Sequence, residues 1–330
     1  MKNIFICYTP YHFLLSFLFK GRGDDDLIVF IDQYNNLEEW AVVLKGIKNS
    51  KFVAFEYARS IFKLTRVLKK ILKDWRLKSK QIEAVYIFND RAKHTWIALN
   101  CIRTKNIFYI EDGSSAYSNS KIKTIKVKEI IFRILSKIPY LKYKYVEVLG
   151  TSPMIVGGYY LYPNNVRDEN KIKPIFQYEK SDENLTEITR IFLKLFNFNL
   201  KNESSLLVLL PSLSDVSFFN EFNKIAEEVA ISNDQLLLIK NHPLDKNYKN
   251  IIKQKNIEAL PSFYPAEAAI ITGKSQAIIG SFTTALYVSK FLFENCTVIN
   301  VSTKESREEN ILFYNFLSEI NVQQIQINVN

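Results

Sequence analysis

The stretch "NIFICYTPYHFLLSFLF", residues 3–19, joins two apolar runs through a short polar interruption. The first run has the length and β-branched content of a buried strand, and "YTPYH" predicts a loop with a helix starting near Phe13. That interruption, with no small-residue cleavage site after it, argues against a signal peptide. A buried strand, a loop and a helix in this order indicate the start of a βαβ unit.

Comparable apolar runs recur along the chain. They predict strands at 3–9, 27–32, 51–56, 84–89, 106–111 and 145–150, and again at 205–212, 235–240, 257–260, 277–280 and 296–301. Helical patterns lie at 13–20, 37–48, 59–80, 91–103, 124–138, 184–197, 216–231, 283–292 and 305–319. Because the strands are apolar throughout rather than alternating, they indicate parallel sheets covered on both faces.

The densest run of Pro, Gly and Asn lies at 151–180 and marks the passage from one βαβ domain to the next. The fold class predicted is therefore α/β, with two Rossmann-like, doubly wound domains facing each other across a cleft. We expect an N-terminal domain at 1–155 and a C-terminal domain at 156–330, whose last helix could pack back on the first domain.

Composition excludes several classes of protein. A chain of 330 residues with 47% apolar residues is not disordered, and its three cysteines, Cys7, Cys101 and Cys296, form neither a disulfide framework nor a metal spacing. A reducing, cytoplasmic compartment fits this cysteine usage. No apolar run approaches the roughly 20 residues of a membrane span, so the protein is expected to be soluble or peripheral.

The net charge of +10 is concentrated in two amphipathic segments. Residues 61–80 and 121–144 each carry eight Lys or Arg against a single acidic residue. Such basic helices bind anionic membrane surfaces, although ordinary solvated helix faces remain an alternative. No nucleic-acid-binding motif accompanies them, so nucleic acid is not the expected partner.

Neither a G-x-G-x-x-G nor a P-loop is present, and no H-E-x-x-H, C-x-x-C or G-x-S-x-G appears. Three predicted strand exits remain as candidate sites. The first is "FYIEDGSSAYS", where Glu111, Asp112 and Gly113 follow a strand. A carboxylate aimed across the sheet edge by a glycine turn can serve as a general base, and an ordinary acidic turn is the alternative.

The second exit is "IKNHPLDK", residues 239–246, with Lys240 and His242. A histidine and a lysine at this position can bind a phosphate leaving group, while a surface imidazole beside a turn proline is the alternative.

The third exit is "IIGSFTTALYVSKF", residues 278–291, where Ser281, Thr283 and Thr284 lead into a helix. Hydroxyls and free amides at a helix N-terminus hold phosphate without metal, and simple N-capping is the alternative.

Together, EDG, the HP pair and the later hydroxyl cluster resemble the D/E-D/E-G, HP and S/T-S/T motifs of bacterial sialyltransferases. These motifs are shared by the lipooligosaccharide sialyltransferases of glycosyltransferase family 52, the marine-type sialyltransferases and the bacterial polysialyltransferases. "YPAEAAIITG", residues 264–273, is similar to the segment with the ribose-binding glutamate, here Glu267. "CYTPYHFLL" is similar to the opening of the lipooligosaccharide group, which this sequence resembles most.

The resemblance implies a GT-B fold and inverting, metal-independent transfer of sialic acid from CMP-Neu5Ac to a sugar hydroxyl, most simply of galactose. Asp112 would be the base, and His242 would assist the departing phosphate. The residues implied to hold the nucleotide are Lys240, Pro243, Glu267, Gly280, Ser281, Thr283 and Thr284, and which hydroxyl holds the phosphate stays open.

Thr9, His12, Asn89, Asp90, Glu111 and Gly113 are predicted acceptor or sugar contacts, because all of them lie at strand exits of the first domain. Turn capping is the alternative for Thr9, His12, Asn89 and Asp90. Asp90 is also a rival for the role of base, since it too follows a strand.

The acceptor class implied is a bacterial surface glycan, that is, lipooligosaccharide, O-antigen or capsule, free or linked to lipid. The basic helices would then dock the enzyme on the inner face of the cytoplasmic membrane, as a monomer or a homodimer. Alternatives are a transferase of Kdo or another nonulosonic acid, a hexosyltransferase of the same family, or a non-catalytic nucleotide-binding membrane adaptor.

Overall fold

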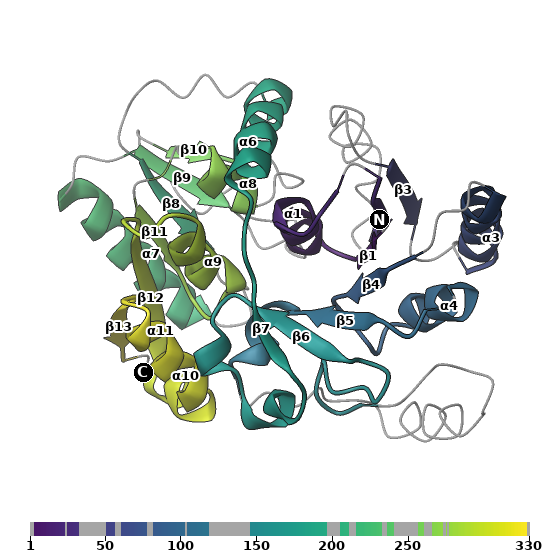
Figure 1. Cartoon of the computed structure of the whole chain (residues 1–330). Coiled ribbons are helices and arrows are strands. Elements are labelled where there is room, and N and C mark those ends of the chain that lie inside the picture. The colour runs from purple at the N-terminus through teal and green to yellow at the C-terminus, as the bar shows by residue number, and fades with distance from the viewer. Residues whose placement is uncertain are drawn as a thin grey trace. The chain divides into compact units, whose positions relative to one another are not determined.

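The computed structural model of the chain describes residues 3–23, 25–32, 51–56, 61–77, 82–102, 104–118, 146–196, 205–210, 216–232, 236–240, 257–260, 266–272, 275 and 277–328. These residues divide into two compact units, Met1–Ile188 and Thr189–Asn330. Each unit is built on one parallel sheet, so the predicted fold class of two parallel α/β domains is confirmed (Figure 1). The helices predicted at 37–48 and 124–138 lie outside the described residues.

The first sheet has seven strands in the order β3-β2-β1-β4-β5-β6-β7. Its helices and strands are β1 (Asn3–Cys7), α1 (Pro10–Leu18), β2 (Leu27–Asp32), β3 (Lys51–Glu56), α3 (Ile61–Leu77), β4 (Ala84–Ile87), α4 (Lys93–Cys101), β5 (Ile107–Ile110), β6 (Gly157–Tyr160), β7 (Ile175–Gln177) and α6 (Asp182–Phe196), the last of which continues into the second unit. Short 3₁₀ helices lie at η1 (Gly113–Ala116), η2 (Pro163–Asn165) and η3 (Asp168–Ile172).

The second sheet has six strands in the order β10-β9-β8-β11-β12-β13. Its elements are β8 (Ser205–Leu209), α7 (Val216–Ser232), β9 (Leu236–Lys240), β10 (Ile257–Ala259), α8 (Ala266–Ile271), β11 (Ala277–Gly280), α9 (Thr284–Leu292), β12 (Thr297–Thr303), α10 (Lys304–Glu309), α11 (Ile311–Glu319) and β13 (Gln323–Ile327).

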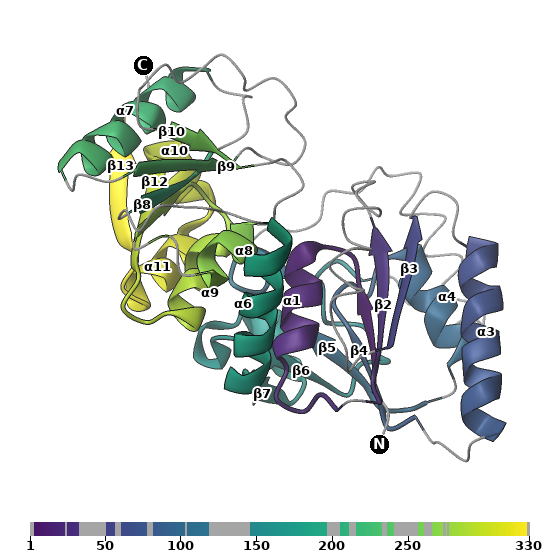
Figure 2. The same cartoon turned by 90° about the horizontal axis from the view of Figure 1, so that it is seen from above.

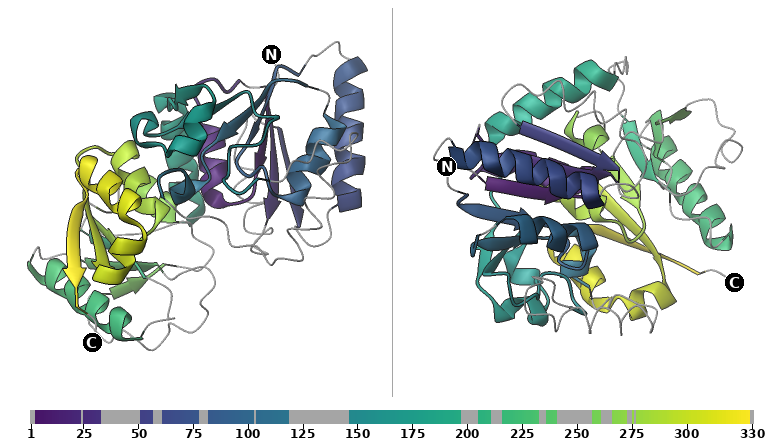
Figure 3. Two further views of the ribbon diagram at one scale, coloured as in Figure 1. Left: turned by 90° about the horizontal axis from the view of Figure 1, so that it is seen from below. Right: turned by 90° about the vertical axis from the view of Figure 1, so that its right-hand side faces the viewer.

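Helices cover both faces of each sheet, as the continuous apolar strands predict. In the first unit α1 lies on one face, and α3 and α4 lie on the other (Figure 2). In the second unit α7 lies on one face, and α9 and α11 lie on the other (Figure 3). Every residue of β1 and β2 is buried, because neither face of the central strands meets water.

Aromatic rings link four neighbouring strands of the first sheet. Phe5 of β1 stacks on Tyr86 of β4 at a centroid distance of 4.7 Å, and Tyr86 lies 5.6 Å from Phe108 of β5. Phe108 in turn meets Tyr159 of β6 edge-on at 5.8 Å. Ring pairs of this kind between neighbouring strands stabilise a sheet beyond the area they bury.

The predicted strand at 145–150 is wrong over its described part, because residues 146–150 form a bend and a turn. The strand that pairs with β5 is β6, whose sequence "GGYY" lacks the usual β-branched residues. Its glycines are required by close packing: a Cβ on Gly157 would lie 2.5 Å from the ring of Phe176, and one on Gly158 would lie 2.6 Å from the ring of Tyr160. Glycine usually weakens a strand, and here it marks close approach instead.

Strands β6 and β7 also bear on the domain division. Both are hydrogen-bonded into the first sheet, and the contacts divide the chain between residues 188 and 189. The boundary predicted from composition, between 155 and 156, lies before these two strands. The Pro- and Gly-rich segment thus contains the last two strands of the first sheet, of which β7 is at the edge.

Helix α1 begins at Pro10, not near Phe13 as the sequence pattern predicts. The Thr9 side chain accepts a hydrogen bond from the backbone N–H of His12, and Pro10 occupies the first helical position. Both features are typical of a helix start. Capping, one of the two alternatives for Thr9, is therefore what the structure shows, and His12 lies in the first turn of a helix.

Within the described parts of the chain, no helix is both long enough and apolar enough to cross a bilayer.

We expect Gly150→Ala to lower the free energy of unfolding by about 1–3 kcal/mol, because a left-handed backbone and a steric clash combine there. Gly150 has φ +82°, and an added Cβ would lie 2.7 Å from the ring of Tyr109. The matched control is Gly23→Ala, where no atom lies within 4 Å of the added Cβ. Urea-induced unfolding measures both changes, and equal stability of the two variants would contradict the prediction.

Candidate functional site

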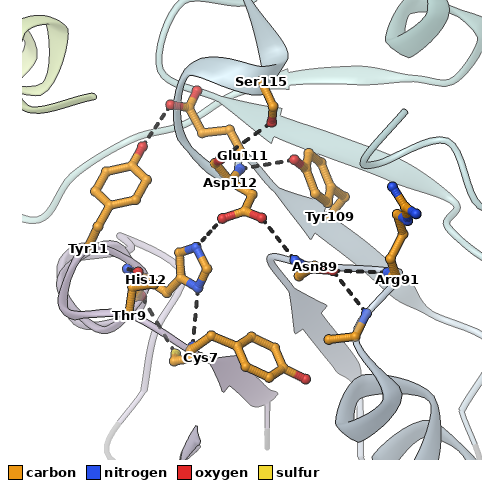
Figure 4. A network of polar contacts seen from close by, with 12 residues as sticks. Cys7, Thr9, Tyr11, His12, Asn89, Arg91, Tyr109, Glu111, Asp112 and Ser115 are labelled. Atoms are coloured by element: carbon orange, nitrogen blue, oxygen red, sulfur yellow. Dashed lines mark hydrogen bonds and ion pairs between the residues drawn. The ribbon is translucent and has the colours of Figure 1, made fainter. Parts of the chain in front are cut away.

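The carboxyl ends of β1, β4 and β5 lie side by side, because β1 pairs with β4 and β4 pairs with β5. The chain first runs outward from β1 to β2 and β3, so the strand order reverses between β1 and β4. Ligands of open α/β sheets bind outside the carboxyl ends at such a reversal. Predicted site residues from three separate strand exits meet at this edge (Figure 4).

Asp112 is the centre of the polar network at this edge. Its Oδ1 lies 2.5 Å from Nε2 of His12, and its Oδ2 accepts a hydrogen bond from Nδ2 of Asn89 at 3.2 Å. Its backbone N–H donates to the hydroxyl of Tyr109 at 2.9 Å. The side chain is nevertheless 19% exposed. A carboxylate that is oriented through both oxygens and still reachable from solvent is suited to taking a proton from a bound hydroxyl.

The other ring nitrogen of His12 fixes its tautomer. The backbone N–H of Tyr8 donates to Nδ1 at 3.2 Å, so Nδ1 is an acceptor and the ring proton lies on Nε2. Nε2–H therefore donates to Asp112. The ring stacks on Phe88 at 4.4 Å, and the residue is only 2% exposed. Because so little of it is exposed, His12 does not suit the predicted contact with a sugar, and the structure directs it at Asp112 instead.

The amide of Asn89 is also held in one orientation. Its Oδ1 accepts from the backbone N–H groups of Arg91 at 3.0 Å and Ala92 at 2.9 Å. The NH₂ group must then face Asp112, which settles an assignment that is ambiguous from atom positions alone. Asn89 thus caps the turn after β4 and also contacts the candidate base.

Glu111 lies next to Asp112 and has a different environment, since none of it is exposed. It accepts hydrogen bonds from the hydroxyl of Tyr11 at 2.8 Å, from the hydroxyl of Tyr117 and from the N–H of Leu161 at 2.8 Å. Gly113, with φ +77°, makes the turn that follows. Buried and saturated with protein donors, Glu111 does not fit the predicted role of acceptor contact and instead holds the loop.

Asp90 is 4% exposed, and both of its oxygens are engaged. Oδ1 accepts from the N–H of Gly150 at 3.2 Å, and Oδ2 accepts from the N–H of Ser152 at 3.0 Å. Burial raises its pKa to about 6. The structure therefore does not favour Asp90 as a rival base or as an acceptor contact, because it anchors the turn at residues 150–152 away from solvent.

The strand order of the second sheet reverses between β8 and β11. Near this reversal Lys240 ends β9 and is 6% exposed. Burial lowers the pKa of its amine to about 8, and the carboxylate of Glu267 in α8 opposes that shift. At pH 7 the amine is still mostly protonated, so Lys240 is a buried cation close to the predicted ribose-binding glutamate.

The hydroxyl loop, Ser281–Thr284, follows β11. Thr283 occupies the N-cap of α9, but its side chain makes no capping hydrogen bond. Phe282 has φ +43°, which is strained for an aromatic residue. Its N–H donates to Oδ1 of the buried Asn300 at 3.2 Å, and its ring lies 4.7 Å from that of Phe313. Simple capping by Thr283 is therefore not what the structure shows.

Gly280 was predicted to contact the nucleotide, and the structure adds a packing reason for it. A Cβ at this position would lie 3.0 Å from Cγ2 of Thr283 and 3.3 Å from Cβ of Leu209. The glycine therefore allows the hydroxyl loop to approach β8.

Predicted residues His242 and Pro243 lie outside the described residues. The sequence did not indicate the aromatic and amide partners of the site, namely Tyr8, Tyr11, Phe88, Tyr109, Tyr117 and Asn300. The tyrosines of "CYTPYH" were the available signal, since a tyrosine at a strand exit often carries its hydroxyl to a polar partner.

In the described portion of the chain, no three His, Cys, Asp or Glu side chains gather as metal ligands.

The family model described as alpha-2,8-polysialyltransferase (POLYST) matches residues 3–302. The chain belongs to this polysialyltransferase family. It is therefore a glycosyltransferase of the sialyltransferase kind, and the resemblance drawn from the EDG, HP and hydroxyl motifs is confirmed. The matching family model is that of the polysialyltransferases, one of the three groups named for those motifs. No curated protein sequence matches the chain.

Solved structures show the fold of this polysialyltransferase-family chain. The sialyltransferase from Photobacterium damsela superposes with a TM-score of 0.56 at 11% identity, covering 99% of this chain and 81% of that one. The 2,6-sialyltransferase of Photobacterium sp. JT-ISH-224, in a complex with CMP and lactose, gives 0.53 at 12%, covering 98% and 78%. UDP-GlcNAc 2-epimerase from Methanocaldococcus jannaschii gives 0.53 at 13%, covering 100% and 89%. These similarities confirm the predicted GT-B-type fold.

Asp90 is expected to make the stability of this family member depend on pH. Its pKa is about 6 in the folded protein against an ordinary value of 3.8, so the folded state binds the proton more tightly. The stabilisation of the folded state by the proton on Asp90 is therefore complete below about pH 4 and is lost as the pH rises through 6. Between pH 7 and pH 5, the wild type should gain about 1 kcal/mol of unfolding free energy relative to Asp90→Asn. Parallel pH dependence of the two proteins in urea unfolding would contradict this.

Proposed function

We propose that this enzyme transfers sialic acid from CMP-Neu5Ac to a sugar hydroxyl of a bacterial surface glycan, with inversion and without a metal ion. The observation that carries the proposal is Asp112, a partly exposed carboxylate held through both oxygens at the strand-order reversal of the first sheet. General bases are held in this way, with the reactive oxygen positioned before the substrate arrives.

The second unit supplies the features that suit a CMP donor. Lys240 is a buried cation beside Glu267, and Thr283, the N-cap residue of α9, makes no capping hydrogen bond with its side chain. Cations, hydroxyls and the amides of a helix N-terminus all favour a phosphate. The Photobacterium sp. JT-ISH-224 neighbour was solved with CMP and lactose, which supports a nucleotide of the same kind here.

In the proposed reaction, Asp112 accepts the proton of the acceptor hydroxyl, while the oxygen of that hydroxyl bonds to the anomeric carbon of the sialic acid. The bond between that carbon and the phosphate oxygen of the donor breaks, and CMP leaves. His242 would neutralise or protonate the departing phosphate, with the amine of Lys240 and the start of α9 sharing its negative charge. Either Ser281, Thr283 or Thr284 supplies the hydroxyl.

The acceptor is proposed to be galactose at the end of a lipooligosaccharide, O-antigen or capsular glycan. The description of the family favours a second acceptor, the 8-hydroxyl of a terminal sialic acid, with repeated transfer. Both acceptors present a hydroxyl to the same base, so a panel of galactosyl and sialyl acceptors distinguishes them.

The test combines donor binding with transfer. CMP and CMP-Neu5Ac are expected to raise the melting temperature, whereas UDP-glucose, which carries a different nucleotide, is not. Lys240→Met should reduce the shift. Asp112→Asn should keep the shift, because the base does not hold CMP, and should lower the transfer rate about 10²–10⁴-fold.

Asp168→Asn is the matched control, because it removes an acid that is 94% exposed in the same unit. It should leave both donor binding and transfer unchanged. Transfer of Kdo from CMP-Kdo but no transfer of sialic acid from CMP-Neu5Ac would favour the Kdo alternative. A shift with UDP sugars alone would favour the hexosyl alternative. Binding of CMP without transfer to any acceptor would favour the non-catalytic adaptor.

We propose further that α3 holds the enzyme at an anionic membrane surface. Leu64 and Leu68 are fully buried, so the apolar face of the helix packs on its own unit, where α3 contacts α4. The opposite face is cationic and exposed, and its residues are Lys63, Arg66, Lys69, Lys70 and Lys73. Docking would therefore rest on electrostatic attraction between the lysines and the lipid headgroups, without insertion of an apolar helix face into the bilayer. The second basic segment, 121–144, lies outside the described residues.

Vesicle flotation with and without phosphatidylglycerol tests the docking. Replacing Lys63, Lys70 and Lys73 by Gln should weaken binding to anionic vesicles about 10²-fold, at about 1 kcal/mol for each lysine. The control replaces Lys20, Lys171 and Lys304 by Gln, which removes the same charge from other exposed sites. Equal loss in both triple variants would show that net charge, not α3, is responsible.

A further inference from the structure

We infer that His12 is the positioning residue of the base: its Nε2–H fixes Asp112 for the attack and does not itself carry the proton. This inference rests on the proposed function of Asp112. The contact joins residues 100 positions apart and has an Nε2–Oδ1 distance of 2.5 Å. Figure 4 shows the imidazole and the Asn89 amide approaching the carboxylate from two sides.

Several contacts hold the imidazole of His12 in one orientation. Nδ1 accepts the N–H of Tyr8 at 3.2 Å, and Phe88 stacks on the ring with only 10° between the planes. The backbone is fixed as well, since the carbonyl of His12 accepts the hydroxyl of Ser16 at 2.9 Å. His12 follows the capping Thr9 in the first turn of α1. Rotating the ring away from Asp112 would break several of these contacts.

These contacts also decide what the ring can do chemically. Nε2 already bears a proton, and the lone pair of Nδ1 already accepts from the backbone of Tyr8. To take the proton that Asp112 receives, the ring would have to lose that backbone hydrogen bond within the core. His12 therefore donates to the carboxylate and is not a relay.

The second donor completes the constraint. Asn89, whose own carbonyl oxygen is bound to two backbone N–H groups, donates to Oδ2 of Asp112. One donor on each oxygen fixes the plane of the carboxylate and leaves each oxygen with a further lone pair. The acceptor hydroxyl can then meet one defined lone-pair direction, and a displacement of about 1 Å at such a position can cost about 10²-fold in rate.

Two substitutions separate positioning from the other roles. His12→Gln keeps an N–H donor at the position of Nε2 and removes the titratable ring, whereas His12→Leu removes the donor. With enzyme checked for equal melting temperature, kcat should fall about 10–100-fold in His12→Leu and stay within about 5-fold in His12→Gln. The KM values for donor and acceptor should change little in either variant.

Several outcomes would overturn the inference. Equal loss of kcat in His12→Gln and His12→Leu would make the ring a proton carrier. A raised acceptor KM with unchanged kcat in His12→Leu would make it a sugar contact. Unchanged kinetics in both variants, with Asp112→Asn inactive, would remove His12 from the reaction and leave the proposed function intact.

A readout independent of activity keeps the two proposals distinguishable. The chain has only three histidines, so selective ¹⁵N labelling gives three imidazoles, and His12→Gln identifies one of them. We expect a protonated Nε2 and a bare Nδ1 at His12, with the Nε2 signal shifting in Asp112→Asn. A proton on Nδ1 would overturn the inference. This signature in an enzyme that transfers from no donor would overturn the proposed function and reduce the pair to a structural contact.

Discussion

The parallel pairing of β1 with β4 is the constraint on which the first unit depends. These strands adjoin only because the chain first extends the sheet through β2 and β3 on the far side of β1. The pairing brings the exits of β1, β4 and β5 to one edge, where helices and turns fix their side chains. The contact between His12 and Asp112 is therefore a product of sheet topology rather than of any local motif.

Two adjacent acids at the end of β5 have opposite environments. Glu111 is fully buried among tyrosine hydroxyls and a backbone amide, whereas Asp112 remains 19% exposed and meets His12 and Asn89. The buried acid fixes the loop to the backbone of Leu161, directly after β6, and the loop in turn fixes the direction of Asp112. Orientation of the candidate base is thus supported from the core as well as from the sheet edge.

Apolar continuity was sufficient to predict most strands of both sheets, because central parallel strands are buried on both faces. It failed at β6, where "GGYY" pairs through close backbone approach, and at β13, where "QQIQI" is a polar edge strand. The position of the EDG turn after a strand indicated a carboxylate site, and the resemblance to bacterial sialyltransferases implied Asp112 as the base. The burial of Glu111 and Asp90 was not, since sequence spacing does not tell which carboxylate turns inward. Nor does it reveal partners that are a hundred residues away.

The hydroxyl loop of the second unit shows what a short signature leaves unsaid. A left-handed Phe282 costs about 1–2 kcal/mol on its own, and the offsetting contacts come from Asn300 and Phe313. Asn300 is itself oriented by a hydrogen bond from its Nδ2 to Gln324 of β13 at 2.8 Å. The residues Ser281–Thr284, transplanted alone onto another sheet, would carry the hydroxyls but not the backbone that aims them. The conformation of the hydroxyl loop therefore depends on residues between 280 and 324, of which the sequence motif includes only the first few.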